Sequence, residues 1–432
     1  MSLRDRLLGH LRARLGAVPL RLVFWDGGSF DFAPAPTVTV TLHSAGLARQ
    51  FLTGNMSRLG EAYVKGELTV DGRIGDIVLV GVALAERIGT SPLVRRLAPL
   101  AGLLGRARRH SRAKDARDVR HHYDVSNDFY RLWLDRQMVY SCAYFITGEE
   151  DLDLAQEQKL DHLCKKLRLK PGERLLDIGC GWGGLICWAA ERYGVSALGV
   201  TLSERQVEEA RRRIADAGLA GRVEARVEDY RDIEGKAPFD KIVSVGMYEH
   251  VGLKNLPVYF AAIARLLKPG GVALNHGITS GDPHGRPQGP PGGEFIDRFV
   301  FPGGELPHLS RVVQEAAAAG LEILDVEDLR PHYPKTLLHW VRRLEDRREA
   351  AIAAAGEERY RIWRMYMAGM AYAFDRGFLS VAQLAAVKPL AGGPAPRPWT
   401  RAYQYQSGQY QSGPYPSEVE TALAGPVDWS AP

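Results

Sequence analysis

The chain has no run of about 18 uncharged apolar residues, which is the length needed to cross a bilayer. Its N-terminus carries charges throughout and lacks the apolar stretch and cleavage site of a secretory signal. Cysteine is scarce: Cys142, Cys164, Cys180 and Cys187 form no CxxC pair and have no histidine cluster at zinc-site spacing. These absences predict a cytoplasmic protein with free thiols and no metal site.

A strong excess of one charge is also missing. The formal net charge is +5, which is too small to indicate a nucleic-acid-binding protein. Nine arginines and lysines nevertheless fall between residues 95 and 120, against two aspartates. Such a stretch suits an anionic lipid surface, at roughly 1 kcal/mol per basic residue. It suits a solvated linker between domains equally well.

The length of 432 residues exceeds one ordinary core and predicts two domains plus tails. Leucines at helical spacing predict a basic amphipathic helix over residues 3–15, and packing on its own domain is favoured over a membrane role. Residues 21–43 have the sequence pattern of β-strands and are followed by helical stretches, which predicts a small α+β domain over residues 1–92. Residues 93–114 are then the basic linker.

Strands alternate with helices over residues 115–390, which predicts an α/β fold with a doubly wound, mostly parallel sheet. The clearest strands are RLLDIG (174–179), SALGVTL (196–202), KIVSVG (241–246) and GVALNHGI (271–278). Residues 391–432 are rich in proline and then repeat YQYQSGQYQSG. We predict that this low-complexity tail is disordered.

The segment LLDIGCGWGGL (175–185) places a glycine-rich turn between a strand and a helix. Its glycines let the backbone approach a ligand closely, and Asp177 can reach the cationic end of that ligand. A dinucleotide site is disfavoured because the second strand ends in Thr201-Leu202-Ser203, without an acid for a nicotinamide ribose. The segment resembles the first motif of class I S-adenosylmethionine methyltransferases, in which Gly179 and Gly181 would cradle the amino-acid part of the cofactor.

Further segments resemble the cyclopropane fatty acid synthases and mycolic acid cyclopropane synthases over about residues 115–385. They are HHYDVSNDFYRLWLDRQMVYSCAYF (121–145), GVTLSERQ (199–206), VGMYEHVG (245–252), LNHGI (274–278), FIDRFVFPGGELP (295–307) and HYPKTLLHW (332–340). GEAYVKGEL, near residue 60, resembles the N-terminal domain of the bacterial phospholipid enzymes. The resemblance implies a class I methyltransferase Rossmann-like sheet, preceded by a smaller α+β domain for lipid binding or dimerisation.

That family binds a bicarbonate ion, and its ligands match positions in this chain. The resemblance implies bicarbonate binding by Cys142, Glu249, His276, Ile278 (through its backbone) and Tyr333, with Glu249, His276, Tyr333 and Cys142 as catalytic residues. For S-adenosylmethionine, it implies Tyr140, Ser141, Asp177, Gly179, Gly181, Thr201, Gln206 and Tyr230. The adenine position departs from the mycolic acid enzymes, because Asp229-Tyr230-Arg231 replaces Gly-Trp-Glu.

Each polar residue also has a simpler interpretation: Cys142 as a buried apolar group, His276 as a core histidine, Glu249 as a helix cap. These residues occur together, each in a segment that resembles the family's motifs, and this favours an active site over the simpler interpretations. We therefore expect methyl transfer from S-adenosylmethionine to a double bond of an unsaturated phospholipid acyl chain, with a carbocation deprotonated by bicarbonate to give a cyclopropane.

Alternative products and functions remain open from the sequence. They are a methyl-branched or methylene fatty acid, a small-molecule N-methyltransferase, and a lipid-surface protein that has lost catalysis. The expected partner is unsaturated phospholipid at the membrane surface, with no nucleic acid. The resemblance also implies a homodimer, and we expect a cytoplasmic protein peripherally associated with the membrane.

Overall fold

A computed structural model describes residues 3–53, 56–88, 126–235, 237–284, 293–301, 304–395 and 397–405. The expected basic linker, 93–114, lies outside these residues, as do residues 121–125 and residues 406–432 of the expected tail. Of that tail, the structure describes residues 391–395 and 397–405, and its disorder stays a prediction. Its short helix η3 (Ala402–Gln404) buries Gln404, and the Arg401 guanidinium pairs with Asp325 at 2.6 Å.

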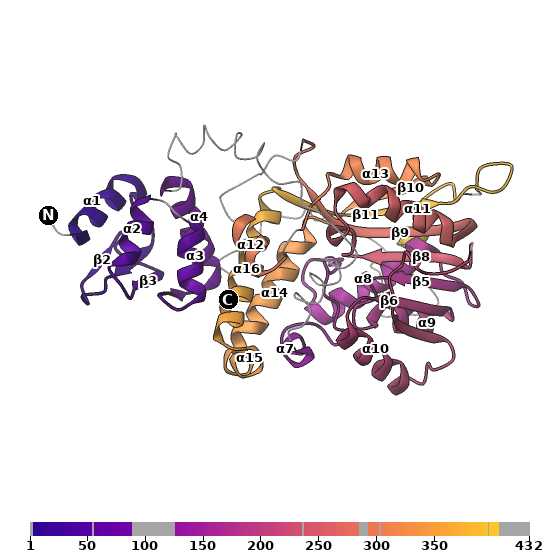
Figure 1. Cartoon of the computed structure of the whole chain (residues 1–432), viewed down its shortest axis with the longest axis horizontal. Helices are drawn as coiled ribbons and strands as arrows, with labels where there is room; N and C mark the ends of the chain where they lie inside the picture. Colours follow the sequence, from indigo (N-terminus) through magenta and orange to yellow (C-terminus); the bar gives the residue numbers. More distant parts are fainter. Residues whose placement is uncertain are drawn as a thin grey trace.

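The N-terminal part is an α+β unit built on a four-stranded sheet of order β2-β1-β3-β4 (Figure 1). Its strands are β1 (Leu20–Val23), β2 (Ser29–Asp31), β3 (Val38–Leu42) and β4 (Leu68–Gly72). Its helices are α1 (Leu3–Leu15), α2 (Gly46–Thr53), α3 (Met56–Val64) and α4 (Ile74–Ile88). Leu7, Leu11 and Leu15 of α1 are fully buried, so this amphipathic helix packs on its own domain as expected.

The larger part carries a seven-stranded sheet of order β10-β11-β9-β8-β5-β6-β7, which confirms the doubly wound α/β fold. The strands are β5 (Arg174–Ile178), β6 (Ser196–Thr201), β7 (Val223–Val227), β8 (Phe239–Val245), β9 (Leu267–Ser280), β10 (Glu322–Asp328) and β11 (Leu379–Val387). Strands β7, β6, β5, β8 and β9 are parallel, whereas β11 runs antiparallel to β9 and β10.

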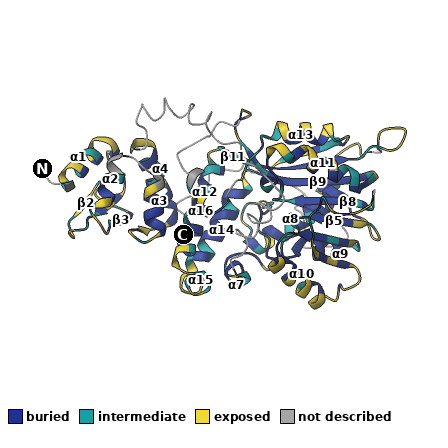
Figure 2. Cartoon of the chain, in the orientation of Figure 1, coloured by how far each residue is buried: buried dark blue, intermediate teal, exposed yellow. Residues whose placement is uncertain are grey.

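Helices cover both faces of this sheet (Figure 1). One face carries α8 (Leu152–Leu167), α9 (Gly184–Tyr193) and α10 (Glu204–Asp216), and the other carries α11 (Leu256–Leu266) and α13 (Leu309–Ala318). Between the sheet and the N-terminal domain lie α7 (Asn127–Arg131), α12 (Gly293–Phe299), α14 (His332–Asp346), α15 (Arg348–Ala355) and α16 (Glu357–Asp375). Burial follows the strands and the inner sides of α14 and α16, while the outer faces of α10 and α13 are exposed (Figure 2).

Arg364 on α16 joins the two domains. Its guanidinium donates to the Glu345 carboxylate at 2.6 Å, to the Tyr63 hydroxyl at 3.3 Å and to the Gly72 carbonyl at 3.4 Å. Only 8% of the residue is exposed. The N-terminal domain is thus held through a largely desolvated cation, because Tyr63 and Gly72 belong to that domain and Glu345 to α14.

Replacing this cation should weaken the whole protein. Arg364→Met keeps the apolar stem but leaves Glu345 and Tyr63 without their partner, so the free energy of unfolding should fall by about 2 kcal/mol. Arg376→Met, at the exposed C-cap of the same helix, should change it by less than about 0.5 kcal/mol. Urea denaturation followed by tryptophan fluorescence measures both, and equal midpoints for the two variants contradict the prediction.

Candidate active site

The glycine-rich turn follows β5 directly and leads into α9. Its backbone has positive φ angles at Gly179 (+91°), Gly181 (+54°) and Gly183 (+84°), a region that L side chains rarely adopt. At Gly184, a Cβ atom would lie 2.6 Å from the carbonyl oxygen of Gln137. Local conformation and close packing therefore both require glycine here.

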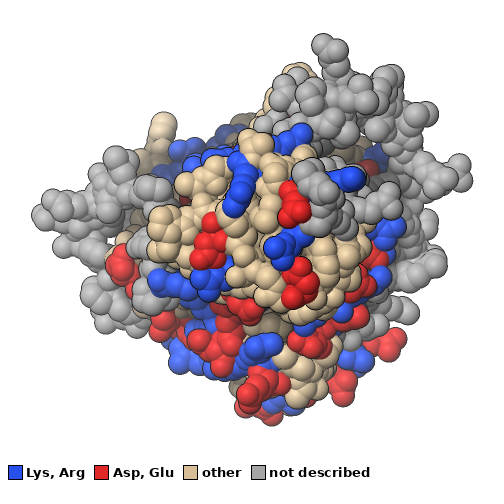
Figure 3. All heavy atoms as spheres, turned by 90° about the vertical axis from the view of Figure 1, so that its left-hand side faces the viewer, with Lys and Arg blue, Asp and Glu red and all other residues tan. Residues whose placement is uncertain are grey.

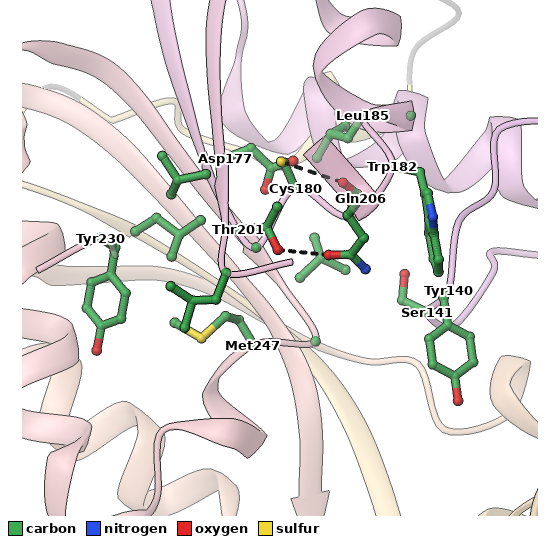
Figure 4. Close-up of a pocket in the computed structure, with 18 of the residues that line it drawn as sticks. Tyr140, Ser141, Asp177, Cys180, Trp182, Leu185, Thr201, Gln206, Tyr230 and Met247 are labelled. Carbon is green, nitrogen blue, oxygen red and sulfur yellow. Dashed lines mark hydrogen bonds between the residues drawn. The ribbon is translucent and has the colours of Figure 1, made fainter. Parts of the chain in front are cut away.

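A cavity opens beside this turn, and all eight predicted cofactor residues line it: Tyr140, Ser141, Asp177, Gly179, Gly181, Thr201, Gln206 and Tyr230. In Figure 4, Tyr140 and Ser141 stand at one end with Trp182, while Tyr230 and Met247 stand at the other. Between them, the Thr201 hydroxyl donates to Gln206 Oε1 at 2.8 Å, which ties the end of β6 to the first turn of α10. Residues from five separate segments thus meet around one elongated space.

Asp177 is the buried acid of this cavity. It is 2% exposed, and its Oδ1 atom has no hydrogen-bond partner in the described part of the chain. Burial raises the pKa of this carboxyl to about 7, while the charge of Lys159 lowers it in part. A desolvated carboxylate with a spare oxygen suits a cationic ligand group, such as the α-ammonium of S-adenosylmethionine. The residues present therefore fit that cofactor.

The opposite end of the cavity contains Asp229-Tyr230-Arg231, the segment that differs from the mycolic acid enzymes in sequence. Tyr230 is 8% exposed, and its ring meets the Tyr259 ring edge-on at 5.6 Å. Arg231 binds Asp229 through two hydrogen bonds of 2.8 and 2.6 Å. Asp229 and Glu228 are the acids on this part of the wall, and Arg231 holds the Asp229 carboxylate in place.

A second polar centre lies next to the cavity, on β9 and the short helix η1 (Tyr248–His250). Glu249 accepts a 2.7 Å hydrogen bond from the Ile278 backbone N–H through Oε1, whereas its buried Oε2 has no partner among the described residues. Burial raises the pKa of this carboxyl to about 7. Met247 and His250, on either side of Glu249, line the cofactor cavity, so the two centres adjoin.

His276 lies two residues before Ile278 on β9, so the two side chains share one face of the strand. It is 2% exposed, and burial lowers its pKa well below the usual value, so the ring is neutral. The Gln383 side-chain amide donates to His276 Nδ1 at 3.2 Å, which leaves the proton on Nε2. Nε2 has no partner in the described residues and is free to donate to a ligand.

Cys142 and Tyr333 lie in the hydrophobic cluster against which Ile278 packs. Cys142 is fully buried, and burial raises the pKa of its thiol, so it is an S–H donor and not a thiolate. Tyr333 is 7% exposed, with its ring 4.5 Å from that of Phe374. Hydrogen bonding and strand geometry thus join Glu249, His276 and Ile278, whereas Cys142 and Tyr333 share a core cluster with Ile278 alone of these three.

Several residues around these centres were not among those predicted from the sequence. Gln383 is fully buried on β11 and lies opposite His276 in the strand register. The sequence signal that could have identified it is a single amide side chain within an otherwise apolar strand. On α16, Trp363 packs 5.7 Å from the Tyr140 ring, and Tyr366 lies 5.7 Å from Trp363. Burial and the charge of Glu249 both raise the pKa of Tyr366, so this tyrosine lies near the second centre.

The sheet order and the glycine turn after β5 define a class I methyltransferase. The family described as mycolic acid cyclopropane synthetase matches residues 110–384, and a domain of unknown function matches residues 9–89. The chain belongs to the mycolic acid cyclopropane synthetase family and is an S-adenosylmethionine-dependent methyltransferase.

Two relatives span nearly the whole chain. A probable fatty acid methyltransferase from Pseudomonas putida is 46% identical over 393 residues, covering 90% of this chain and 97% of the relative. A tuberculostearic acid methyltransferase from Mycobacterium tuberculosis is 34% identical over 394 residues, covering 88% and 90%. The solved structure of a mycolic acid cyclopropane synthase complexed with SAH and CTAB matches with a TM-score of 0.60 at 37% identity, over 63% of this chain and 98% of that one.

Gly277, between His276 and Ile278, allows the Tyr248 ring to pack flat on β9. A Cβ atom there would lie 2.4 Å from the ring, so Gly277→Ala should displace Tyr248 and with it Glu249. We expect kcat to fall about a hundredfold through this misplacement, while the Kd for the cofactor stays close to wild type. Gly369→Ala, where a Cβ meets nothing within 4 Å, is the matched control in steady-state and binding assays. Equal kcat for the two variants would contradict this account.

Glu249→Gln should stabilise the protein at alkaline pH. Because burial raises the pKa of Glu249 from 4.5 to about 7, the folded state binds this proton more tightly than the unfolded state. That contribution to the free energy of unfolding is complete below the unfolded pKa and is lost as pH rises through the folded pKa. At 1.36 kcal/mol per pKa unit it amounts to about 3 kcal/mol.

The Tm of Glu249→Gln should therefore exceed that of wild type at about pH 8 and match it near pH 5, because glutamine does not ionise. Differential scanning calorimetry in bicarbonate-free buffer makes the comparison. A Tm difference of the same size at both pH values would show that the carboxylate charge is not its origin.

Proposed function

We propose that this enzyme transfers a methyl carbon from S-adenosylmethionine to the double bond of an unsaturated acyl chain in a membrane phospholipid, and that the product is a cyclopropane fatty acid. The observation that carries the proposal is the second polar centre. Glu249 Oε2 and His276 Nε2 are both buried without partners among the described residues. Met247 and His250, which flank Glu249, line the cofactor cavity. Relatives named fatty acid methyltransferases support an acyl substrate.

The reaction needs a base because an alkene has no lone pair to give. When bound, the cofactor supplies the methyl group as a sulfonium. The π electrons of the alkene form a C–C bond to the methyl carbon as its C–S bond breaks, and S-adenosylhomocysteine leaves. The other alkene carbon becomes a carbocation. Loss of a proton from the transferred methyl group then closes the three-membered ring with the electrons of that C–H bond.

The second centre fits a small oxyanion that takes this proton, and we propose bicarbonate. Neutral His276 donates from Nε2, and the Tyr333 hydroxyl supplies a further donor. The Cys142 thiol, which donates to the Ala143 carbonyl at 3.3 Å, would turn to the anion when it binds. Glu249, with its pKa raised to about 7, shares a proton with the anion, so that two adjacent negative charges are avoided. Burial of all four residues keeps water from capturing the carbocation.

Aromatic rings next to this centre suit the cationic intermediate. Tyr140 lies within 5.8 Å of four other rings, those of Tyr130, Trp133, Trp340 and Trp363. The faces of such rings attract a cation, by about 2 kcal/mol or more when water is excluded. The same apolar wall accommodates a hydrocarbon chain.

The phospholipid partner, the homodimer and the peripheral membrane location are also proposals. They are supported by the resemblance of residues 60–68 to the N-terminal domain of the phospholipid enzymes. Figure 3 shows lysine and arginine scattered among aspartate and glutamate on the face of the N-terminal domain, so charge alone does not single out a lipid-docking surface there. No helix in the described residues is long and apolar enough to span a membrane.

A second candidate product is a methyl-branched or methylene fatty acid. The same carbocation would form. Loss of a proton from a neighbouring chain carbon would then give a methyl-branched alkene, whereas a 1,2-hydride shift followed by proton loss from the transferred methyl group would give a methylene group. A saturated branch would require a separate reductase. This alternative is favoured by the relatives that span about 90% of the chain, since they are named methyltransferases. Those named cyclopropane mycolic acid synthases align with only 63% of it.

Mass spectrometry of acyl chains tests the proposal. The purified protein is incubated with S-adenosylmethionine and vesicles of monounsaturated phospholipid, with free fatty acid as a parallel substrate. We expect phospholipid acyl chains to gain one CH₂ unit, and fragmentation to distinguish a ring from a branch. Glu249→Gln and bicarbonate-depleted buffer should each lower the yield about a hundredfold, within the range of general-base catalysis. Intact cofactor binding without any acyl product would overturn the proposal.

A further inference from the structure

Lys159 on α8 is a buried cation in the wall of the cofactor cavity. Only 1% of the residue is exposed, and its Nζ donates to the Ser141 hydroxyl at 2.9 Å. An ammonium group has three N–H donors, and Ser141 is the one hydrogen-bond acceptor that the described part of the chain offers it. A lysine removed from water in this way has donor capacity left for a ligand.

The nearby carboxylates do not use up this capacity. Asp135 is occupied by the loop before Tyr140, where it accepts from the Gln137 and Val139 backbone N–H groups at 2.8 Å each. Asp177 interacts with Lys159 electrostatically and retains the unpartnered Oδ1 described above. One buried cation and one buried anion therefore line the same cavity, each with an unmet hydrogen-bonding position.

This pair of charges matches the zwitterionic methionine part of the cofactor. We propose that Lys159, together with the Ser141 hydroxyl, binds the α-carboxylate of S-adenosylmethionine, while Asp177 accepts from the α-ammonium. Lys159 is then the residue that distinguishes the intact cofactor from analogues without a carboxylate. The proposal concerns the cofactor and does not depend on which acyl substrate is methylated.

The physical reason is the cost of burying the two ligand charges. A carboxylate that leaves water for this cavity needs a charge-assisted hydrogen bond to offset its desolvation. A neutral hydroxyl from Ser141 alone would not offset it. A fixed lysine on α8, already desolvated when the protein folds, meets the carboxylate without further reorganisation.

The test compares two ligands on two proteins by isothermal titration calorimetry. The ligands are S-adenosylhomocysteine and its decarboxylated analogue, which keeps the amine and the adenosine. Wild type should bind the former about a hundredfold more tightly, as expected for a buried charge pair. In Lys159→Met, which keeps the apolar stem, this ratio should fall to about threefold or less. General damage to the cavity lowers both affinities and leaves the ratio unchanged.

Lys166→Met is the matched control. Lys166 lies on the same helix and is also fully buried, but its ammonium pairs with Asp325 and Glu327, away from the cavity. Its ligand ratio should equal that of wild type. A wild-type ratio near one would overturn the proposal even if Lys159→Met did not fold. An undiminished ratio in folded Lys159→Met would overturn it as well, and would leave Lys159 as a counter-charge for Asp135 and Asp177.

Discussion

The carboxylates of Asp177 and Glu249 are removed from water, and each keeps an oxygen without a partner in the described residues. Burial of such groups is unfavourable unless the charge is matched, and here it raises both pKa values to about 7. The rest of the site depends on this mismatch. The protein folds with polar atoms that its described residues leave unsatisfied, and the proposed cofactor and oxyanion would complete them. Stability is thereby lower than an apolar core of the same size would give.

The topology brings the two carboxylates to one edge of the sheet. Asp177 is the penultimate residue of β5, and Glu249 follows β8, the neighbouring parallel strand, so both stand near the carboxyl ends of these strands. Antiparallel β11 then places Gln383 beside His276 on β9 and fixes which ring nitrogen carries the proton. The glycine at 277 lets Tyr248 approach β9 so closely that Glu249 reaches the Ile278 N–H.

The local sequence predicted the strands and the glycine turn. Both the alternation of strand and helix patterns and the need for glycine at positive φ angles can be recognised from short stretches of sequence. The set of residues on the second centre came from resemblance. Gln383 and Trp363 were missed because each lies more than 100 residues along the chain from the residue that it contacts. Gln383 contacts His276, and Trp363 contacts Tyr140. No local sequence pattern encodes such contacts. The packing of Gln404, beyond residue 391, is non-local in the same way. Gln404 is buried there by tertiary packing, whereas composition indicated disorder.

Helix α16 connects the active-site wall to the N-terminal domain. Trp363 packs against Tyr140 of the cofactor cavity, while the adjacent Arg364 bonds to Tyr63 and Gly72. Arg361, one turn earlier, also donates to backbone carbonyls of that domain. Because consecutive residues of a helix move together, a shift of the N-terminal domain would move Trp363 as well. The aromatic wall that must exclude water from the reaction therefore depends on a domain that contributes none of the predicted site residues.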